Sequence, residues 1–419
     1  MRIVVVGGGA AGMMAAIAAA GEGREVILLE KNEKLGKKLF ITGKGRCNVT
    51  NACEKQEFFD NIVSNPDFMY SSFDRWSNWD MYGFLEDAGV PLKIERGGRV
   101  FPVSDKSSDI LRALEQELSK RGVRIRLHTA VERVLVQNGQ VCGVATGKSS
   151  GRPGDRKIWE ADRVIVCTGG LSYPSTGSTG DGHRWALELG HSVTACRPAL
   201  VPLEAAFACG LPCREVQGLA LKNVGVTFFQ DGKKVAGDFG ELLFTHFGVS
   251  GPVILSASSR VGARLEKREV LLQINLKPAL TDRQMSERLQ REIAASPSGQ
   301  ISSLLGGWMP RSLLPVFLRQ AKIKPERKSG SISGAEREKL TDSITHLALT
   351  VRALRGYNEA IVTQGGISVK ELWPASMESR RVAGRYFAGE TLDLDAYTGG
   401  YNLQIAWSSG YAAGTAAAR

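Results

Sequence analysis

The sequence is poor in the residues and spacings that build disulfide frameworks and metal sites. Its seven cysteines are an odd number and no pair is spaced C-x-x-C, while its five histidines are scattered without an H-x-x-x-H spacing. These absences argue against a disulfide framework and against a zinc site. We therefore predict a reducing compartment, a cytoplasmic location and no bound metal.

Long apolar runs are also scarce. Residues 3–21 form the one uncharged stretch of nearly membrane-spanning length, but five glycines interrupt it. A second strand pattern follows this stretch, which neither a signal peptide nor a membrane span would require. We therefore expect no membrane segment. The length of 419 residues and the hydrophobic content of 43% predict two or three domains with a large core.

Acidic residues are fewer than basic ones, with 43 Asp and Glu against 54 Lys and Arg, for a net charge of +11. This excess favours an anionic partner such as nucleic acid, although a phosphorylated cofactor alone is an equally open explanation. The best local candidate for such a contact is the basic run at residues 311–328, which predicts either an RNA-facing patch or a solvated helix face. Its cations are Arg311, Arg319, Lys322, Lys324, Arg327 and Lys328.

The first thirty residues carry the most specific pattern in the chain. An apolar strand over residues 3–6 runs into Gly7, Gly9 and Gly12 in the spacing G-x-G-x-x-G, a helical stretch follows, and a second apolar strand ends at Glu30. The glycines permit a tight turn, close approach of a pyrophosphate and close helix packing. The helix N-terminus offers N–H groups to phosphates, and Glu30 is suited to accept ribose hydroxyls. This pattern predicts a site for an ADP-containing dinucleotide.

Further glycine-rich turns follow later strands. A basic loop occupies residues 31–51, a strand over 163–167 runs into a hydroxyl-rich turn over 172–182, and a strand over 384–388 leads to a glycine–acid pair. In a doubly wound sheet such turns meet in one crevice at the carboxyl ends of the strands. Between these parts, short strand patterns begin near residue 198 and helical periodicity begins near residue 281.

At these motifs the chain resembles the bacterial NAD(P)/FAD-dependent oxidoreductases, a family of single-Rossmann flavoproteins. The resemblance rests on residues 5–12, 43–51, 242–252 and 386–390 with 399–404, and extends over the whole chain. It implies an α/β fold in which a Rossmann-like FAD-binding domain is interrupted by an insert with a small β-barrel part and a helical part. The corresponding predicted segments are 1–197 with 355–419 for the FAD-binding domain, 198–278 for the barrel and 279–354 for the helices.

The resemblance also implies which residues contact FAD. For the ADP half these are Gly7, Gly9, Ala10, Ala11, Gly12, Glu30 and Lys31, with Val131 at adenine and Thr168 and Gly169 at the pyrophosphate. For the flavin side they are Lys38, Gly45, Arg46, Cys47, Asn48, Gly389, Glu390, Gly400, Asn402 and Leu403. A helix beginning after Gly400 would direct its N–H groups at negative charge on the flavin ring.

The activity expected from this resemblance is NAD(P)H-driven reduction of a polarised C=C bond. Family members resemble reductases of bile-acid-type enones, oxidases of small amino ketones, or dihydrouridine synthases of ribosomal RNA, so all three substrate classes stay open. A non-catalytic, flavin-bound RNA-binding protein is the alternative of another class. Cys47 is our first candidate for the proton donor because a thiol beside Arg46 can be tuned, with Tyr397 and His246 as further candidates.

Overall fold

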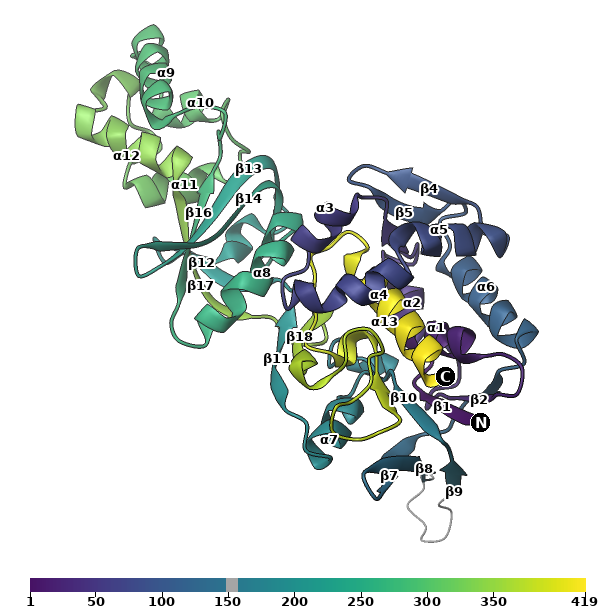
Figure 1. Ribbon diagram of the computed structural model, residues 1–419. Coiled ribbons are helices and arrows are strands. Elements are labelled where there is room, and N and C mark those ends of the chain that lie inside the picture. The colour runs from purple at the N-terminus through teal and green to yellow at the C-terminus, as the bar shows by residue number, and fades with distance from the viewer. Residues whose placement is uncertain (148–156) are drawn as a thin grey trace. The chain divides into compact units, whose positions relative to one another are not determined.

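The computed structural model describes residues 1–147 and 157–419, which divide into two compact units (Figure 1). Unit 1 comprises Met1–Pro198 and Ala360–Arg419, and unit 2 comprises Ala199–Glu359. The chain therefore returns from unit 2 to unit 1 after Glu359, rather than after residue 354 as predicted. Arg355 still belongs to unit 2 because its N–H donates to the Pro202 carbonyl at 3.0 Å and its guanidinium pairs with Glu204 at 2.9 Å.

A parallel sheet forms the centre of unit 1, with strand order β19-β10-β1-β2-β6. The strands are β1 (Arg2–Val6), β2 (Glu25–Leu29), β6 (Arg124–Arg126), β10 (Arg163–Val166) and β19 (Arg385–Phe387). The apolar, β-branched residues of β1, β2 and β10 are buried because helices cover the sheet, as is usual for parallel sheets. The α/β class with a Rossmann-like domain, predicted from the sequence, is confirmed.

Smaller elements surround this sheet. The helices are α1 (Ala10–Ala19), α2 (Lys37–Ile41), α3 (Lys55–Asp60), η1 (Pro66–Met69), α4 (Tyr70–Arg75), α5 (Asn78–Asp87), α6 (Ser107–Lys120), η2 (Pro174–Thr176), α7 (Asp181–Glu188), η5 (Val369–Glu371), η6 (Gly389–Thr391) and α13 (Tyr401–Ala417). The remaining strands form the sheets β3-β5-β4, β7-β8-β9 and β11-β18. Their bounds are β3 (Thr50–Asn51), β4 (Leu92–Glu95), β5 (Arg99–Pro102), β7 (Val131–Gln137), β8 (Gln140–Thr146), β9 (Lys157–Glu160), β11 (Val193–Ala199) and β18 (Val362–Ile367).

Helices α1 and α13, from opposite ends of the chain, pack closely against each other (Figure 1). A Cβ atom at Gly410 would collide with the Ala11 carbonyl oxygen, and one at Gly414 would collide with the Ala15 carbonyl oxygen. These two glycines lie four residues apart and thus on one face of α13. The contact anchors α13 against the helix that follows the first glycine-rich turn.

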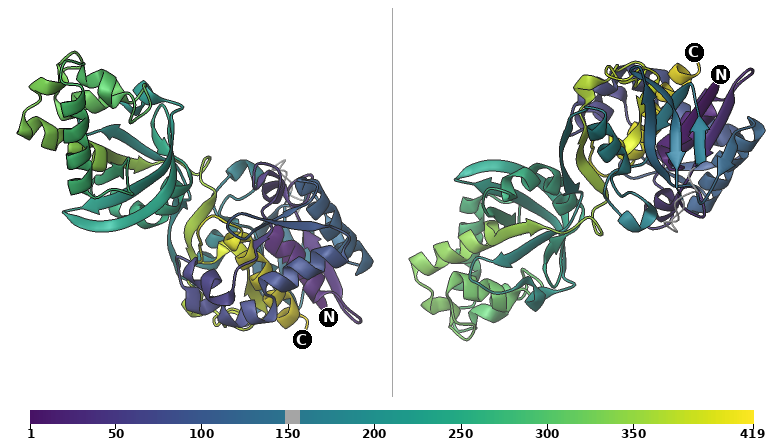
Figure 2. Two further views of the ribbon diagram at one scale, coloured as in Figure 1. Left: turned by 90° about the horizontal axis from the view of Figure 1, so that it is seen from above. Right: turned by 90° about the horizontal axis from the view of Figure 1, so that it is seen from below.

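Unit 2 contains a closed antiparallel barrel with strand order β12-β15-β14-β13-β16-β17 (Figure 2). The strands are β12 (Leu203–Phe207), β13 (Ala220–Gln230), β14 (Lys233–Phe244), β15 (Gly248–Ser250), β16 (Val270–Asn275) and β17 (Leu347–Leu354). The helices of unit 2 are η3 (Cys213–Val216), α8 (Pro252–Leu265), α9 (Asp282–Ala295), α10 (Ile301–Leu305), α11 (Leu314–Ala321), η4 (Ser329–Ser331) and α12 (Gly334–Thr345).

The predicted helical segment, 279–354, is wrong at its end. Helices α9 to α12 lie together within it, but its last residues form β17, which pairs with β12 and β16 and closes the barrel. The barrel segment 198–278 likewise includes α8, which the sequence analysis did not predict. The first error arises because the pairing partners of β17 lie more than seventy residues away in sequence, so local periodicity does not reveal them. Among the described residues no helix is both long and apolar enough to cross a membrane.

We expect Gly414→Ala to lower the free energy of unfolding by about 1–3 kcal/mol, because the added methyl group must displace the α1 backbone. Gly83→Ala is the matched control: Gly83 also lies within a helix, α5, but has open space where a Cβ would be. There the change should stabilise the protein by about 0.5–1 kcal/mol. Chemical denaturation checks both values, and equal effects of the two changes would contradict the close packing of α1 and α13.

Candidate functional site

A cavity opens in unit 1 where the parallel strands reach their carboxyl ends. Its walls come from the turn after β1, the end of β2, α2, the loops after β10 and β19, and the first turns of α13. Predicted site residues that line it are Gly7, Gly9, Ala10, Ala11, Glu30, Lys31, Lys38, Val131, Thr168, Gly169, Gly389, Glu390, Asn402 and Leu403. Segments far apart in sequence therefore contribute to one site.

The N-terminus of α1 is shaped to receive an anion. Gly9 is its N-cap residue and no side chain caps the helix, so its first N–H groups lack an intrahelical partner. The position of a Cβ on Gly9 is open space, whereas one on Gly7 would collide with the Cys167 carbonyl and one on Gly12 with the Gly7 carbonyl. Gly7 and Gly12 hold the turn tight, and Gly9 leaves room for a phosphate beside the helix N-terminus.

The Glu30 carboxylate is held in a fixed orientation at the end of β2. Its Oε2 accepts the Gly8 N–H at 2.7 Å, and its Oε1 accepts the Asn32 N–H at 2.8 Å and the Asn32 Nδ2 at 2.7 Å. The side chain is 8% exposed and lines the cavity. A carboxylate has about four acceptor sites, so one lone pair remains for a ligand hydroxyl.

Another part of the cavity wall is formed by the loop before α13 and by that helix. Asn402 fixes this loop, because its Oδ1 accepts the Ala396 N–H at 2.9 Å and its Nδ2 donates to the Ala396 carbonyl at 2.7 Å. Gly400 is the N-cap of α13 with φ of 102°, and a Cβ there would collide with the Thr50 backbone. Gly400 does not line the cavity, but it lets α13 begin close to β3.

Some residues predicted to contact FAD do not line this cavity. One is Gly12 of the ADP half, and the others belong to the flavin side: Gly45, Arg46, Cys47, Asn48 and Gly400. Arg46 is engaged elsewhere, since its Nε donates to Asp105 at 2.7 Å, its Nη2 pairs with Glu95 at 2.5 Å and its guanidinium stacks on Phe101. The Oδ1 of Asn48 is buried and, within the described residues, has no hydrogen-bond partner. That oxygen is an acceptor available to a bound group.

Cys47 is fully buried, and its N–H donates to the Thr42 carbonyl at 2.9 Å. Burial raises the pKa of the Cys47 thiol to about 12. The sequence argument expected Arg46 to tune this thiol, but Arg46 is committed to two carboxylates. The thiol is therefore protonated near neutral pH, and its role in proton transfer stays a prediction.

The other two candidate proton donors lie in different units. Tyr397 is half-buried in the loop before α13, where its backbone N–H donates to the Asn61 carbonyl at 2.9 Å. His246 is exposed in unit 2, in the turn between β14 and β15, with its ring against Phe247. Neither side chain lines the cavity.

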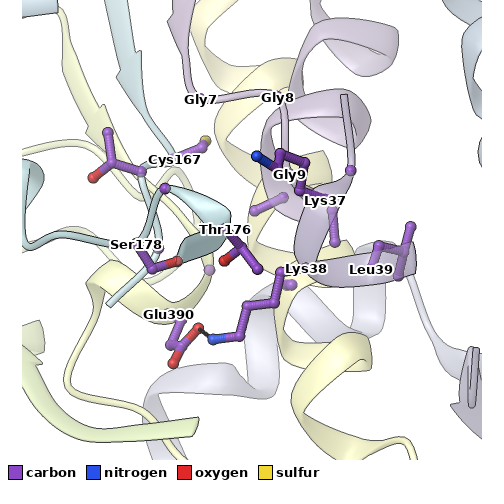
Figure 3. A pocket seen from close by; sticks show the side chains of 18 of the residues that line it. Gly7, Gly8, Gly9, Lys37, Lys38, Leu39, Cys167, Thr176, Ser178 and Glu390 are labelled. Atoms are coloured by element: carbon purple, nitrogen blue, oxygen red, sulfur yellow. Dashed lines mark hydrogen bonds and ion pairs between the residues drawn. The ribbon is translucent and has the colours of Figure 1, made fainter. Parts of the chain in front are cut away.

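Sequence reasoning missed a group of lining residues in the hydroxyl-rich turn after β10. Lys31 pairs with Asp181 at 2.8 Å, and the Asn32 amide donates to the Thr176 carbonyl at 3.0 Å, which ties this turn to the end of β2. Thr176 and Ser178 line the cavity (Figure 3), and so does Asp181. The signal was present as the cluster of glycines and hydroxyls over 172–182, but single residues could not be chosen from it.

The residues of the cavity fit a dinucleotide with an ADP half. An uncapped helix N-terminus with open space at Gly9 suits a diphosphate, and the buried Glu30 carboxylate suits ribose hydroxyls. The remaining walls are mixed, with Leu39, Leu403 and Ala406 beside Lys38 and Glu390, which suits a flat ring with polar edges.

We expect Glu30→Ala to raise the dissociation constant for FAD about 10- to 100-fold, since a hydrogen bond to a charged group contributes about 1.5–3 kcal/mol. Glu33→Gln is the control, because Glu33 lies on the same loop but is exposed and pairs with Lys37. Titration of the apoprotein with FAD, followed by flavin fluorescence, measures both. Unchanged affinity in Glu30→Ala would show that the carboxylate does not hold the nucleotide.

Comparison with known proteins identifies close relatives over the full length. Residues 1–416 match the family described as HI0933-like protein Rossmann domain. The chain is 32% identical to a 3-dehydro-bile acid delta(4,6)-reductase of Clostridium scindens, over 100% of this chain and 99% of that protein. It is 30% identical to a ribosomal RNA dihydrouridine synthase of Haemophilus influenzae, over 98% of this chain and 96% of that protein.

Solved structures share the fold at lower identity. One is a 3-ketosteroid delta1-dehydrogenase from Sterolibacterium denitrificans, with a TM-score of 0.53 and 13% identity over 99% of each chain. Another is a 3-ketosteroid-delta4-(5alpha)-dehydrogenase from Rhodococcus jostii, with a TM-score of 0.50 and 17% identity over 100% of this chain and 96% of that one.

These relationships confirm the predicted family and the oxidoreductase class. The match covers nearly the whole chain, and the relatives at 30% identity or more are aligned from end to end. The chain belongs to the HI0933-like family of Rossmann-domain proteins.

Proposed function

We propose that this chain is an FAD-dependent reductase that uses NAD(P)H to reduce a polarised C=C bond. The observation that carries the proposal is the cavity of unit 1, in which the uncapped N-terminus of α1 and the oriented Glu30 carboxylate share one space with α2 and α13. The name of the Clostridium relative, a reductase, and that of the Haemophilus relative, a dihydrouridine synthase, support this reaction class.

The chain's own residues have distinct tasks in this proposal. The α1 N–H groups would hold the diphosphate, Glu30 would hold the adenosine ribose, and Val131 at the start of β7 would meet the adenine. Leu403 and Asn402 would contact the ring, with Asn402 also holding the preceding loop. When bound, FAD supplies the hydride chemistry, and the chain must orient the acceptor and deliver one proton to it.

The reductase proposal is tested by anaerobic stopped-flow measurement. NADH and NADPH are each mixed with the FAD-loaded protein, and the reduced flavin is then mixed with candidate enones or with RNA. We expect loss of flavin absorbance with one nicotinamide cofactor and its return with an acceptor. Peroxide formation from small amines or amino ketones without NAD(P)H would instead favour the oxidase alternative. A flavin that no nicotinamide reduces, together with tight RNA binding, would favour the non-catalytic alternative.

Cys47 is the first proton-donor candidate to be tested. If its thiol delivers the proton, Cys47→Ala retains FAD and is reduced at the normal rate, but its reoxidation by the acceptor slows about 100-fold or more. Cys142→Ala is the control, since Cys142 is exposed on β8. Equal reoxidation rates in the two variants would exclude Cys47, and Tyr397→Phe and His246→Gln would then be compared in the same way.

A uridine in ribosomal RNA is the acceptor that we favour. All six predicted cations of residues 311–328 are exposed, on α11 and in the segments beside it. Arg327 is committed to Glu336 at 2.8 Å. Within the described chain, the other five form no ion pair with an acid, so their charge is available to phosphates. The printed name of the Haemophilus relative supports the same substrate class.

We expect Lys322→Glu with Lys324→Glu to weaken RNA binding and to reduce the slope of log affinity against log salt by about 2, because two phosphate contacts are lost. Lys233→Glu with Lys234→Glu makes the same charge change at the exposed start of β14 and should leave the slope unchanged. Filter binding over a salt series measures both. Complete dihydrouridine in ribosomal RNA of a deletion strain, by mass spectrometry, would contradict the RNA proposal.

A further inference from the structure

An ion pair crosses the candidate cavity between α2 and η6. The Lys38 Nζ lies 2.5 Å from the Glu390 Oε2, and both side chains line the cavity (Figure 3). They are 25% and 19% exposed. Each is therefore largely withdrawn from solvent but accessible to a bound ligand.

The Glu390 carboxylate is fixed from behind by residues to which the sequence analysis gave no role. Its Oε1 accepts the Ser172 hydroxyl at 2.6 Å and the Thr363 N–H at 2.8 Å. The Thr363 hydroxyl oxygen in turn accepts the Leu171 N–H at 2.8 Å and the Ser172 N–H at 3.0 Å. Ser172 and Thr363 are fully buried.

This network determines where the lysine charge lies. With Oε1 occupied by two donors, Oε2 is the oxygen that faces the cavity and meets Lys38. The Ser172 hydroxyl oxygen also contacts the Lys38 Nζ. A partly exposed ion pair contributes only about 0–1 kcal/mol to stability, so this degree of orientation is more than folding requires. Fixed orientation of this kind is required of a charge that acts on a bound ligand.

The surroundings of the pair suit a ring more than a phosphate. The phosphate-binding features are gathered at the α1 N-terminus, around Gly9. Lys38 is followed on α2 by Leu39, and Leu403 and Ala406 of α13 line the same cavity. Apolar walls beside the oriented Lys38 ammonium are suited to a flat heterocycle that acquires negative charge.

We propose that Lys38 and Glu390 together set the reduction potential of the flavin, with Ser172 and Thr363 as positioning residues for Glu390. This inference rests on the proposed binding of FAD. Uptake of two electrons and one proton converts the neutral oxidised ring into an anion. The Lys38 ammonium stabilises that anion, whereas the Glu390 carboxylate opposes it. The two residues therefore act on the potential with opposite sign.

The test is the midpoint potential of the FAD-loaded protein, measured against a reference dye with dithionite or xanthine oxidase as reductant. Lys38→Met leaves the carboxylate unopposed, so the potential should fall. Glu390→Gln leaves the ammonium unopposed, so the potential should rise. We expect about a tenfold change in the reduction equilibrium in each case, which is about 30 mV for a two-electron couple. Lys34→Met removes the same charge at an exposed site and should shift nothing.

Sulfite provides a second readout, because it adds to oxidised flavin and gives an anionic product. Its affinity should decrease in Lys38→Met and increase in Glu390→Gln. Shifts of the same sign in both variants would overturn the proposal. Faster FAD release from Lys38→Met without a change of potential would also overturn it, since Lys38 would then act on the phosphates.

These measurements use no C=C acceptor and no nicotinamide cofactor. If the potentials of Lys38→Met and Glu390→Gln shift in opposite directions but the protein reduces no acceptor, this inference stands and the reductase proposal is rejected. A wild-type protein that takes up no FAD would reject both.

Discussion

The structure of unit 1 depends on how closely one helix approaches its neighbours. Helix α1 begins directly after β1 because Gly12 sits against the Gly7 carbonyl, and it is covered by α13 because Gly410 and Gly414 leave room for its backbone. Side chains at these positions would push the helix away from the sheet. Its free N–H groups would then no longer point into the cavity, and the anion site depends on that direction.

Two groups of polar atoms in the cavity wall are already oriented for a ligand. At one part of its wall, backbone N–H groups without a capping side chain can bind an anion. There the buried Glu30 carboxylate, held by Gly8 and Asn32, can accept hydroxyl groups. Elsewhere an ammonium and a carboxylate are paired and oriented by buried hydroxyl and amide groups. Both arrangements are set before a ligand binds, so binding requires little reorganisation.

Unit 2 is a barrel with a group of helices inserted between its last two strands, β16 and β17. The chain leaves the barrel after β16, forms α9 to α12, and returns in β17 to close the sheet between β12 and β16. Because the barrel is closed, the described strands leave no long unpaired edge. The helices can thus carry an exposed basic surface without disturbing the strand pairing that supports them.

The sequence by itself determined the Rossmann core, because its evidence is local: a β-branched strand, glycines at fixed spacing, a helix and a carboxylate follow one another within thirty residues. Fourteen of the twenty cofactor-binding residues predicted from it line the cavity. Only the tertiary structure decided the rest. Arg46 is drawn to Glu95 and Asp105, and Glu390 is fixed by Ser172 and Thr363, through contacts between residues 27 to 218 positions apart. Such partners are chosen by how the chain packs, and neither composition nor local periodicity contains that information.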